Sequence, residues 1–252
     1  MRHRGFSYDA PMSEPERKAS DRHVVAMGGG GFLFGREWEA LDDYALALTG
    51  EATPKVCYLP TASGDPGDDI VRFYESFQRK SCVPSHLRLF TRTVVDPRAL
   101  LLAQDLVYVG GGNTADMLAV WRVHGVDVIL REAWEAGVVM CGMSAGALCW
   151  FEGGTTDSFG LDLAPLHDGL GLLPGSFSPH YDGEAQRRPV YHRCVADGTL
   201  PDGLAADNGA AVHFVGRELA EAVSVHAGRR VYRVERVDGE ARETPVETRV
   251  LD

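Results

Sequence analysis

The chain has 252 residues, of which 44% are hydrophobic and 24% charged, and its formal net charge is −11. A chain of this length and composition can bury an adequate core, and its acidic balance excludes the basic surface that nucleic-acid phosphates require. No apolar run approaches the roughly 18–20 residues of a membrane span, which excludes a transmembrane protein.

Residues 1–22 are predicted to be a flexible leader, because they show no periodicity and bury little apolar surface. They also lack the apolar stretch of a secretory signal. The five cysteines are scattered without a CxxC pair, which favours reduced thiols over a disulfide framework or a zinc site. We therefore expect a soluble cytoplasmic protein with one domain over residues 23–252.

Short apolar runs alternate with segments of helical periodicity between residues 23 and 146. Short runs bounded by glycine or proline are typical of buried parallel strands. Such strands are predicted at residues 23–27, 55–60, 87–90, 105–109 and 138–141. Helices are predicted at residues 36–49, 68–80, 114–121 and 126–136. This alternation indicates right-handed βαβ units and an α/β fold with a mostly parallel sheet.

The pattern changes after about residue 205. Strands are predicted at residues 210–215, 219–226 and 230–237, with glycine-containing turns after each of them. These are hairpin signals, so an antiparallel C-terminal extension is expected. No internal repeat or interdomain linker interrupts residues 23–252, which favours one domain.

The most informative motif is Gly142-Met-Ser-Ala-Gly146, between a predicted buried strand and a predicted helix. This is the G-x-S-x-G pattern in the context that a nucleophilic serine needs. Small neighbours let the backbone turn sharply and expose the hydroxyl of Ser144. The following helix directs its N–H groups toward developing negative charge. Ser144 is therefore the candidate nucleophile, and the alternative is a serine in a packing turn.

A serine hydroxyl needs a base, and nine histidines compete for that role. Most of them begin or flank structural elements, or lie on a predicted solvated helix face. His180 differs because it follows Ser178-Pro179, at what looks like a strand end opening into a loop. Loops at strand ends carry catalysis in open α/β sheets, so His180 is the preferred candidate.

Two glycine-rich loops follow predicted strands. In the loop beginning at Gly110, an N–H of Gly111 or Gly112 could join that of Ala145 as an oxyanion hole. Asn113 ends this loop and suits either substrate binding or a helix N-cap. The other loop, residues 28–31, fits neither the dinucleotide fingerprint nor the P-loop pattern, so no nucleotide cofactor is expected.

Five motifs together resemble peptidase E and its cyanophycinase relatives, the S51 serine peptidases. They are Gly28-Gly-Gly-Gly31, Leu59-Pro-Thr-Ala-Ser63, Gly110-Gly-Gly-Asn-Thr114, Gly142-x-Ser-Ala-Gly146 and Ser178-Pro-His180. The resemblance covers residues 23 to about 235. It implies a class I glutamine-amidotransferase-like fold, a three-layer α/β/α sandwich, and a homodimer, since dimers are frequent in the family. It also implies Ser144 as nucleophile and His180 as base.

The third member of the site departs from the family pattern. Relatives orient the histidine with an acidic residue near a late strand, and Asn208 stands in that position here. An amide can hold an imidazole tautomer but stabilises imidazolium less than a carboxylate does. Asp207, one residue earlier, and Asp157, which resembles another acidic residue of the peptidase E site, are the alternatives.

A second departure concerns specificity. Aspartyl dipeptidases of this family bind the substrate carboxylate with an arginine about fourteen residues after the histidine. Aligning Gly183-Glu184 with the family motif places Gln186 in that position, followed by Arg187 and Arg188. A neutral amide cannot replace a bidentate guanidinium, so strict specificity for aspartate is not expected.

The sequence thus predicts a serine peptidase that hydrolyses short peptides, of dipeptidase type, through Ser144 and His180. Neither a metal nor an organic cofactor is implied, and neither nucleic acid nor membrane is an expected partner. Two alternatives stay open. One is an esterase or other acyl hydrolase with the same constellation, and the other is a non-catalytic binding protein of the same fold.

Overall fold

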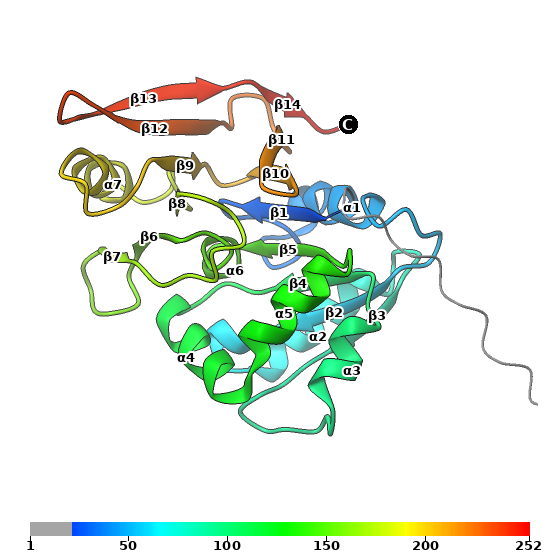
Figure 1. Ribbon diagram of the computed structural model, residues 1–252. Helices are drawn as coiled ribbons and strands as arrows, with labels where there is room; N and C mark the ends of the chain where they lie inside the picture. The colour runs from blue at the N-terminus through cyan, green and yellow to red at the C-terminus, as the bar shows by residue number, and fades with distance from the viewer. Residues whose placement is uncertain (1–21) are drawn as a thin grey trace, which may run out of the picture.

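Two β-sheets and the helices packed on them make up the fold, which this computed structural model describes for residues 22–252 (Figure 1). The predicted leader, apart from Arg22, lies outside the described residues. The larger sheet has the strand order β14-β11-β10-β1-β5-β4-β2-β3. Its strands are β1 (His23–Met27), β2 (Lys55–Leu59), β3 (Val83–His86), β4 (Leu106–Val109), β5 (Val139–Met143), β10 (Ala210–Val215), β11 (Glu218–Ser224) and β14 (Thr248–Val250).

The larger sheet is parallel at its centre and antiparallel toward one edge. Strands β1, β5, β4, β2 and β3 pair in parallel, and helices connect them in chain order as the βαβ pattern requires. Strands β10 and β11 add antiparallel neighbours beside β1. The predicted mostly parallel sheet with an antiparallel C-terminal extension is therefore confirmed.

Helices cover both faces of this sheet because side chains alternate along its strands. Val25 and Met27 pack with the helices of one face, and Val24 and Ala26 with those of the other. The first face carries α1 (Ala40–Ala47) and α2 (Gly67–Phe77), and the second carries α3 (Pro97–Leu102), α4 (Thr114–His124) and α5 (Val126–Glu135). Short 3-10 turns, η2 (Arg36–Trp38) and η3 (Thr61–Ser63), precede α1 and follow β2. These layers confirm the α/β/α sandwich.

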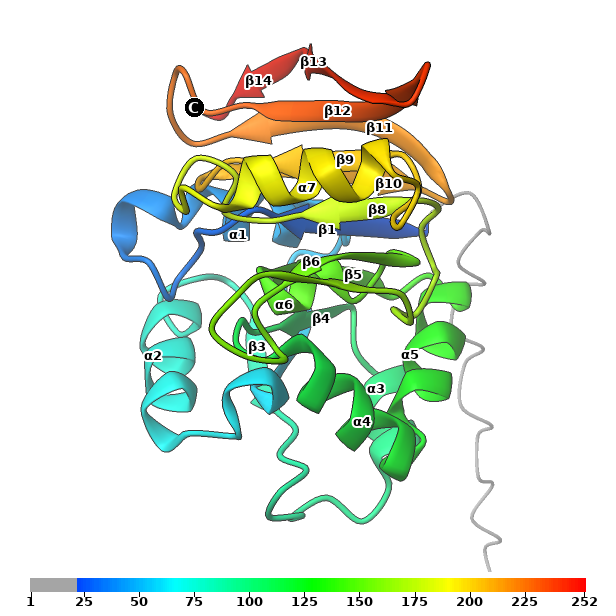
Figure 2. The same cartoon turned by 90° about the vertical axis from the view of Figure 1, so that its left-hand side faces the viewer.

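A second, six-stranded sheet was not predicted from the sequence. Its order is β13-β12-β9-β8-β6-β7. The strands are β6 (Gly153–Thr156), β7 (Ala164–Leu166), β8 (Ser176–Ser178), β9 (Gly203–Ala206), β12 (Val231–Val237) and β13 (Glu240–Val246). Helix α7 (Arg187–Ala196), which Figure 2 shows in front of this sheet, packs mainly against β12 and β13. Phe177 and Leu204 connect this sheet to the main apolar core.

The strand predicted at residues 87–90 was wrong, because β3 lies at Val83–His86 instead. This strand is the edge of the larger sheet, half-exposed and interrupted by Pro84, so its apolar pattern is weak. Leu87 and Leu89 are buried, but they follow the strand in a segment without regular structure. The carboxylate of Asp65 accepts the N–H groups of Leu89 and Phe90 there, in place of a strand ladder.

The topology brings several loops to one place. The carboxyl ends of β1, β5 and β4 are neighbours in the larger sheet. The loops that begin at Gly28, at Ser144 and at Gly110 therefore meet at one edge. In the second sheet, β8 and β9 run parallel, so Ser178 and Ala206 end side by side. The segments that carry His180 and Asn208 leave from these two ends.

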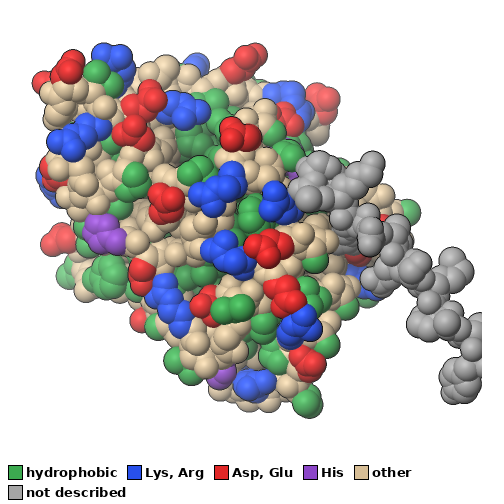
Figure 3. All heavy atoms as spheres, in the orientation of Figure 1, with side chains coloured by type: hydrophobic (Ala, Val, Ile, Leu, Met, Phe, Trp, Pro, Cys, Tyr) green, Lys and Arg blue, Asp and Glu red, His purple; other side chains and the backbone are tan. Residues whose placement is uncertain are grey.

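Within residues 22–252, no helix is both long and apolar enough to span a bilayer. On the face drawn in Figure 3, acidic and basic side chains are interspersed rather than gathered into one large patch of a single sign. The net charge of −11 is thus not concentrated on this face.

Candidate active site

Ser144 occupies a strained turn between β5 and the four-residue helix α6 (Ala145–Leu148). Its φ is 55° and its ψ is −116°, a conformation that costs a non-glycine residue about 1–3 kcal/mol. The Ser144 N–H donates to the Met27 carbonyl at 3.1 Å, and Leu148 N–H donates to the Ser144 carbonyl at 2.9 Å. These bonds hold the serine at the end of the sheet, with its hydroxyl in a cavity.

His180 reaches Ser144 from the second sheet. It follows β8 and also has a positive φ of 53°. Its backbone N–H donates to the Gly28 carbonyl at 2.9 Å, which ties the segment to the end of β1. The ring nitrogen Nε2 lies 2.8 Å from Ser144 Oγ. Phe34 lies nearly parallel to the imidazole, with ring centroids 6.4 Å apart.

Asn208 holds the opposite side of the His180 ring. Its Oδ1 lies 2.7 Å from Nδ1 of His180. An amide oxygen only accepts hydrogen bonds, so Nδ1 carries the proton and Nε2 presents its lone pair. The Ser144 hydroxyl therefore donates to Nε2. The backbone N–H of Asn208 donates to Asp182 Oδ1 at 2.8 Å, which fixes the loop between β9 and β10.

The environment favours a neutral His180. Burial lowers the pKa of its imidazole below the ordinary value, because the charged form loses solvation. The hydrogen bond to Asn208 acts in the opposite direction. Arg187 lowers the pKa further, while the carboxylates of Glu184 and Asp157 raise it through space. The net result is an unprotonated ring beside the serine hydroxyl at neutral pH.

Gly29 makes room for this pair, a role that sequence reasoning missed. A Cβ at this position would lie 2.1 Å from Asn208 Oδ1 and 2.9 Å from His180 Cε1. The Gly29 carbonyl also accepts from Gly209 N–H at 2.7 Å. The glycine run after β1 therefore lets backbone pass directly beneath the imidazole and the amide. The only hint of this role in the sequence was that the run of glycines at residues 28–31 fits no nucleotide-binding pattern.

The loop after β4 lies beside Ser144, as the motif predicted. A Cβ at Gly111 would lie 3.3 Å from Ser144 Cβ. Among the backbone hydrogen bonds that residues 22–252 make outside helices and strands, none uses the N–H groups of Gly111, Gly112 or Ala145, so these donors are available. Asn113 caps α4, since its Oδ1 accepts from Asp116 N–H at 2.9 Å.

The cavity beside Ser144 has a volume of about 320 Å³. Glycine and polar side chains form its wall, and it lies at the small end of the range for ligand pockets. The lining residues are Gly112, Asn113, Ser144, Asp157, Ser158, His180, Glu184 and Arg187. Gln186, the residue aligned with the aspartate-binding arginine of relatives, is exposed and does not line the cavity. Its neighbour Arg187 lines it instead.

Within residues 22–252, neither of the two acidic alternatives to Asn208 forms a hydrogen bond with the His180 ring. Asp207 is buried and accepts from the Arg230 N–H at 3.0 Å. Asp157 is exposed at the mouth of the cavity, after β6. Neither carboxylate makes a hydrogen bond to His180 in the described part of the chain.

No group of three or more His, Cys, Asp or Glu side chains is arranged to hold a metal ion within residues 22–252. The charged side chains of the cavity are instead Asp157, Glu184 and Arg187. The arrangement can deprotonate a hydroxyl and stabilise an oxyanion, using donors and acceptors of the chain itself.

Comparison with known proteins places these features in a family. The model of peptidase family S51 matches residues 24–222. A Bacillus subtilis (strain 168) protein named "Uncharacterized peptidase YgaJ" is 48% identical over 230 residues, which cover 91% of this chain and 99% of that protein. Peptidase E of Shewanella denitrificans is 30% identical over 115 residues, 42% of this chain and 49% of that protein.

Solved structures share the fold. A peptidase from an acI-B1 Actinobacterium superposes with a TM-score of 0.61 at 16% identity, covering 89% of this chain and 94% of that chain. A Listeria monocytogenes EGD-e protein titled a putative peptidase E gives a TM-score of 0.54 at 18% identity, covering 78% and 96%.

Asn208→Asp should raise the pKa of His180 by about 1–3 units, because a carboxylate against Nδ1–H favours imidazolium. The imidazole resonances of His180, followed by NMR from pH 4 to pH 9, measure this pKa directly. Asn208→Ala is the control, since it removes the contact without adding charge. An unchanged pKa in Asn208→Asp would mean that Asn208 does not contact the ring in solution.

Gly29→Ala should separate Asn208 from His180 while leaving the fold intact, because the three atoms nearest to the added methyl group all belong to these two side chains and not to the backbone. We expect loss of the slowly exchanging Nδ1–H signal of His180 in the NMR spectrum. Gly67→Ala is the matched control, since a Cβ there meets nothing within 4 Å. Retention of the signal in Gly29→Ala would contradict the close approach.

Proposed function

The chain belongs to peptidase family S51, the serine-type peptidases, and from that premise we propose that it hydrolyses short peptides with Ser144 as nucleophile and His180 as general base. The observation that carries the proposal is the 2.8 Å contact between Ser144 Oγ and His180 Nε2, on a strand–turn–helix elbow. Asn208 on the far ring nitrogen keeps the lone pair of Nε2 directed at the hydroxyl.

Acylation starts with proton transfer. His180 Nε2 takes the proton of Ser144 Oγ while the oxygen attacks the scissile carbonyl carbon. The carbonyl oxygen becomes an oxyanion beside the free N–H groups of Ala145 and of Gly111 or Gly112. Each such donor is worth about 10²–10³ in rate. His180 then gives its proton to the leaving amine as the C–N bond breaks.

Deacylation repeats these steps with water. His180 removes a proton from water, and the resulting hydroxide oxygen attacks the ester carbonyl of the acyl-enzyme. The proton on His180 returns to Ser144 Oγ as the C–O bond breaks, which releases the carboxylic acid product and restores the resting state. No step consumes a group that the chain and the solvent do not supply.

Compared with an acidic residue in the same position, Asn208 changes the electrostatics of this cycle rather than its geometry. An amide orients the imidazole but adds no negative charge to stabilise imidazolium. Glu184 and Asp157 partly compensate, because both carboxylates favour the protonated ring through space. A cavity of about 320 Å³ suits a short peptide better than a folded protein.

The cellular setting is part of the proposal. The five cysteines are all free thiols, four of them buried, which suits a reducing compartment such as the cytoplasm. A homodimer is the assembly that we expect, and light scattering on the purified protein measures it.

Ser144→Ala should reduce hydrolysis of a dipeptide panel by at least about 1,000-fold without lowering the melting temperature, because it removes only the attacking oxygen. Turnover followed by liquid chromatography, with circular dichroism as the folding control, measures both effects. Ser158→Ala, a serine of the same cavity, is the comparison variant and should retain measurable turnover. Equal peptidase activity in Ser144→Ala and the unmodified protein would remove the proposal.

A further inference from the structure

Arg187 is a buried cation in the wall of the active-site cavity. It is the first residue of α7 and is only 3% exposed. A guanidinium beside the nucleophile would ordinarily attract a substrate carboxylate, because its N–H fork matches two carboxylate oxygens. The hydrogen-bond partners of Arg187 within the protein therefore determine whether it is available to a substrate carboxylate.

Two partners already accept hydrogen bonds from all three nitrogens of the guanidinium. Nε and Nη2 both donate to Glu184 Oε2, at 3.0 and 2.6 Å. Nη1 donates to the Thr155 carbonyl at 2.8 Å. Glu184 thus takes the place that a substrate carboxylate would take on this arginine, and it neutralises the positive charge from inside the protein.

Asp157 adds a second carboxylate to the same cavity. It is exposed, and its side-chain carboxylate makes no hydrogen bond or ion pair with any residue between 22 and 252. With Glu184 and Arg187 paired, Asp157 leaves the cavity with one excess negative charge. A substrate carboxylate here would meet the like charge of Asp157 and a guanidinium whose Nε–Nη2 edge is already bound to Glu184.

We propose that this cavity selects peptides whose side chain beside Ser144 is neutral or basic and rejects aspartate and glutamate, with Glu184 as the specificity-determining residue. The inference rests on the proposed function, since it takes the cavity as the place where the substrate binds. Specificity is a difference of affinities. Glu184 occupies the arginine that an acidic side chain would need, while Asp157 repels acidic side chains and attracts basic ones.

The test compares Asp-Ala, Ala-Ala and Lys-Ala. The unmodified protein should prefer Lys-Ala and Ala-Ala to Asp-Ala. Glu184→Gln keeps a hydrogen-bond acceptor for Arg187 but removes the negative charge. It should raise the ratio of kcat/KM for Asp-Ala over Lys-Ala by at least about 10-fold. The double variant Glu184→Gln with Arg187→Gln should lose that gain, because the newly available cation is absent.

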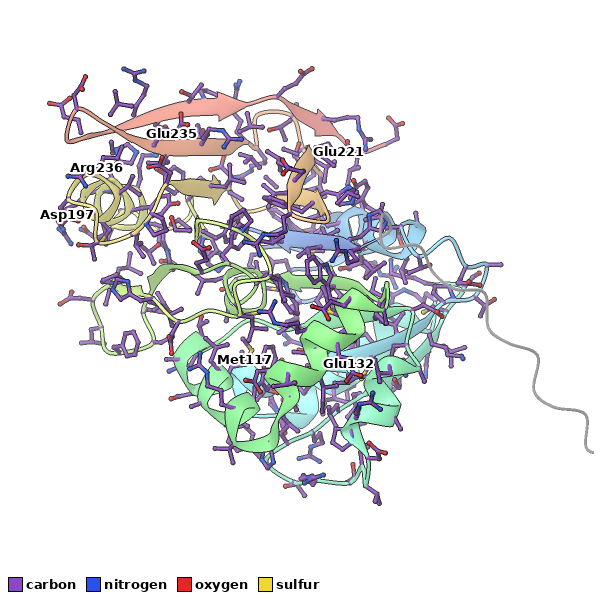
Figure 4. All side chains as sticks on the ribbon, in the orientation of Figure 1. Met117, Glu132, Asp197, Glu221, Glu235 and Arg236 are labelled. Atoms are coloured by element: carbon purple, nitrogen blue, oxygen red, sulfur yellow. The ribbon has the colours of Figure 1, made fainter. Side chains whose placement is uncertain are left out.

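Glu132→Gln is the matched control. Glu132, on α5 (Figure 4), also pairs with an arginine, Arg98, but that pair is exposed and lies outside the cavity lining. The ratio should stay unchanged in this variant. A melting curve for each protein identifies any variant that fails to fold. Asp157→Asn is an independent test, because the preference for Lys-Ala over Ala-Ala should fall in this variant.

Dissociation constants for the three dipeptides are measured in the Ser144→Ala background as well, so that binding preference is read without turnover. If the unmodified protein hydrolyses none of the dipeptides but the dissociation constants follow the predicted order, only the proposed function is contradicted. Preference for Asp-Ala in the unmodified protein, the same ratio in Glu184→Gln, or binding of none of the dipeptides would overturn the inference about charge selection.

Discussion

The hydrogen bond between Ser144 Oγ and His180 Nε2 joins two sheets that the chain builds separately. The serine ends β5 of the larger sheet, and the histidine follows β8 of the smaller one. The glycine run after β1 connects them, because the Gly28 carbonyl accepts the His180 N–H and Gly29 leaves space beneath the imidazole. The site therefore depends on how these two sheets are held together, and the family's glycine-rich motif serves that contact.

Both the backbone conformation and the charge around His180 maintain its hydrogen bond with Ser144. Ser144 and His180 both have positive φ values, and backbone hydrogen bonds to the end of β1 hold each of them there. Asn208 fixes the tautomer without adding charge, so the imidazole stays neutral and basic in its buried position. In the proposed mechanism, the carboxylates of Glu184 and Asp157 favour the protonated imidazole through space, as an acidic third member would. In the proposed selection by charge, the same two carboxylates determine the charge that a substrate meets.

Strong local patterns made much of this predictable. Ser144 followed from small residues around a strand–helix turn, and the parallel strands followed from short apolar runs. The second sheet was missed because β6, β8 and β9 are three or four residues long and rich in Gly, Ser, Thr and Ala, so they carry no clear hydrophobic period. Helix α3 was missed although Asp96-Pro97 is a recognisable start, with the Asp96 side chain capping it. Glu184 and Arg187 are only three residues apart, but the burial of Arg187 against the Thr155 carbonyl is a tertiary contact, which no local pattern shows.

The rate at which a fluorophosphonate modifies the protein, measured against pH with the site identified by mass spectrometry, tests the central claim most directly. We predict a single adduct on Ser144, a rate that rises with pH to a plateau through a midpoint below about 6.5, the ordinary pKa of histidine, and a fall of at least about 100-fold in His180→Gln. Modification of another residue, or an equal rate on Ser144 after His180 is replaced, would contradict the account.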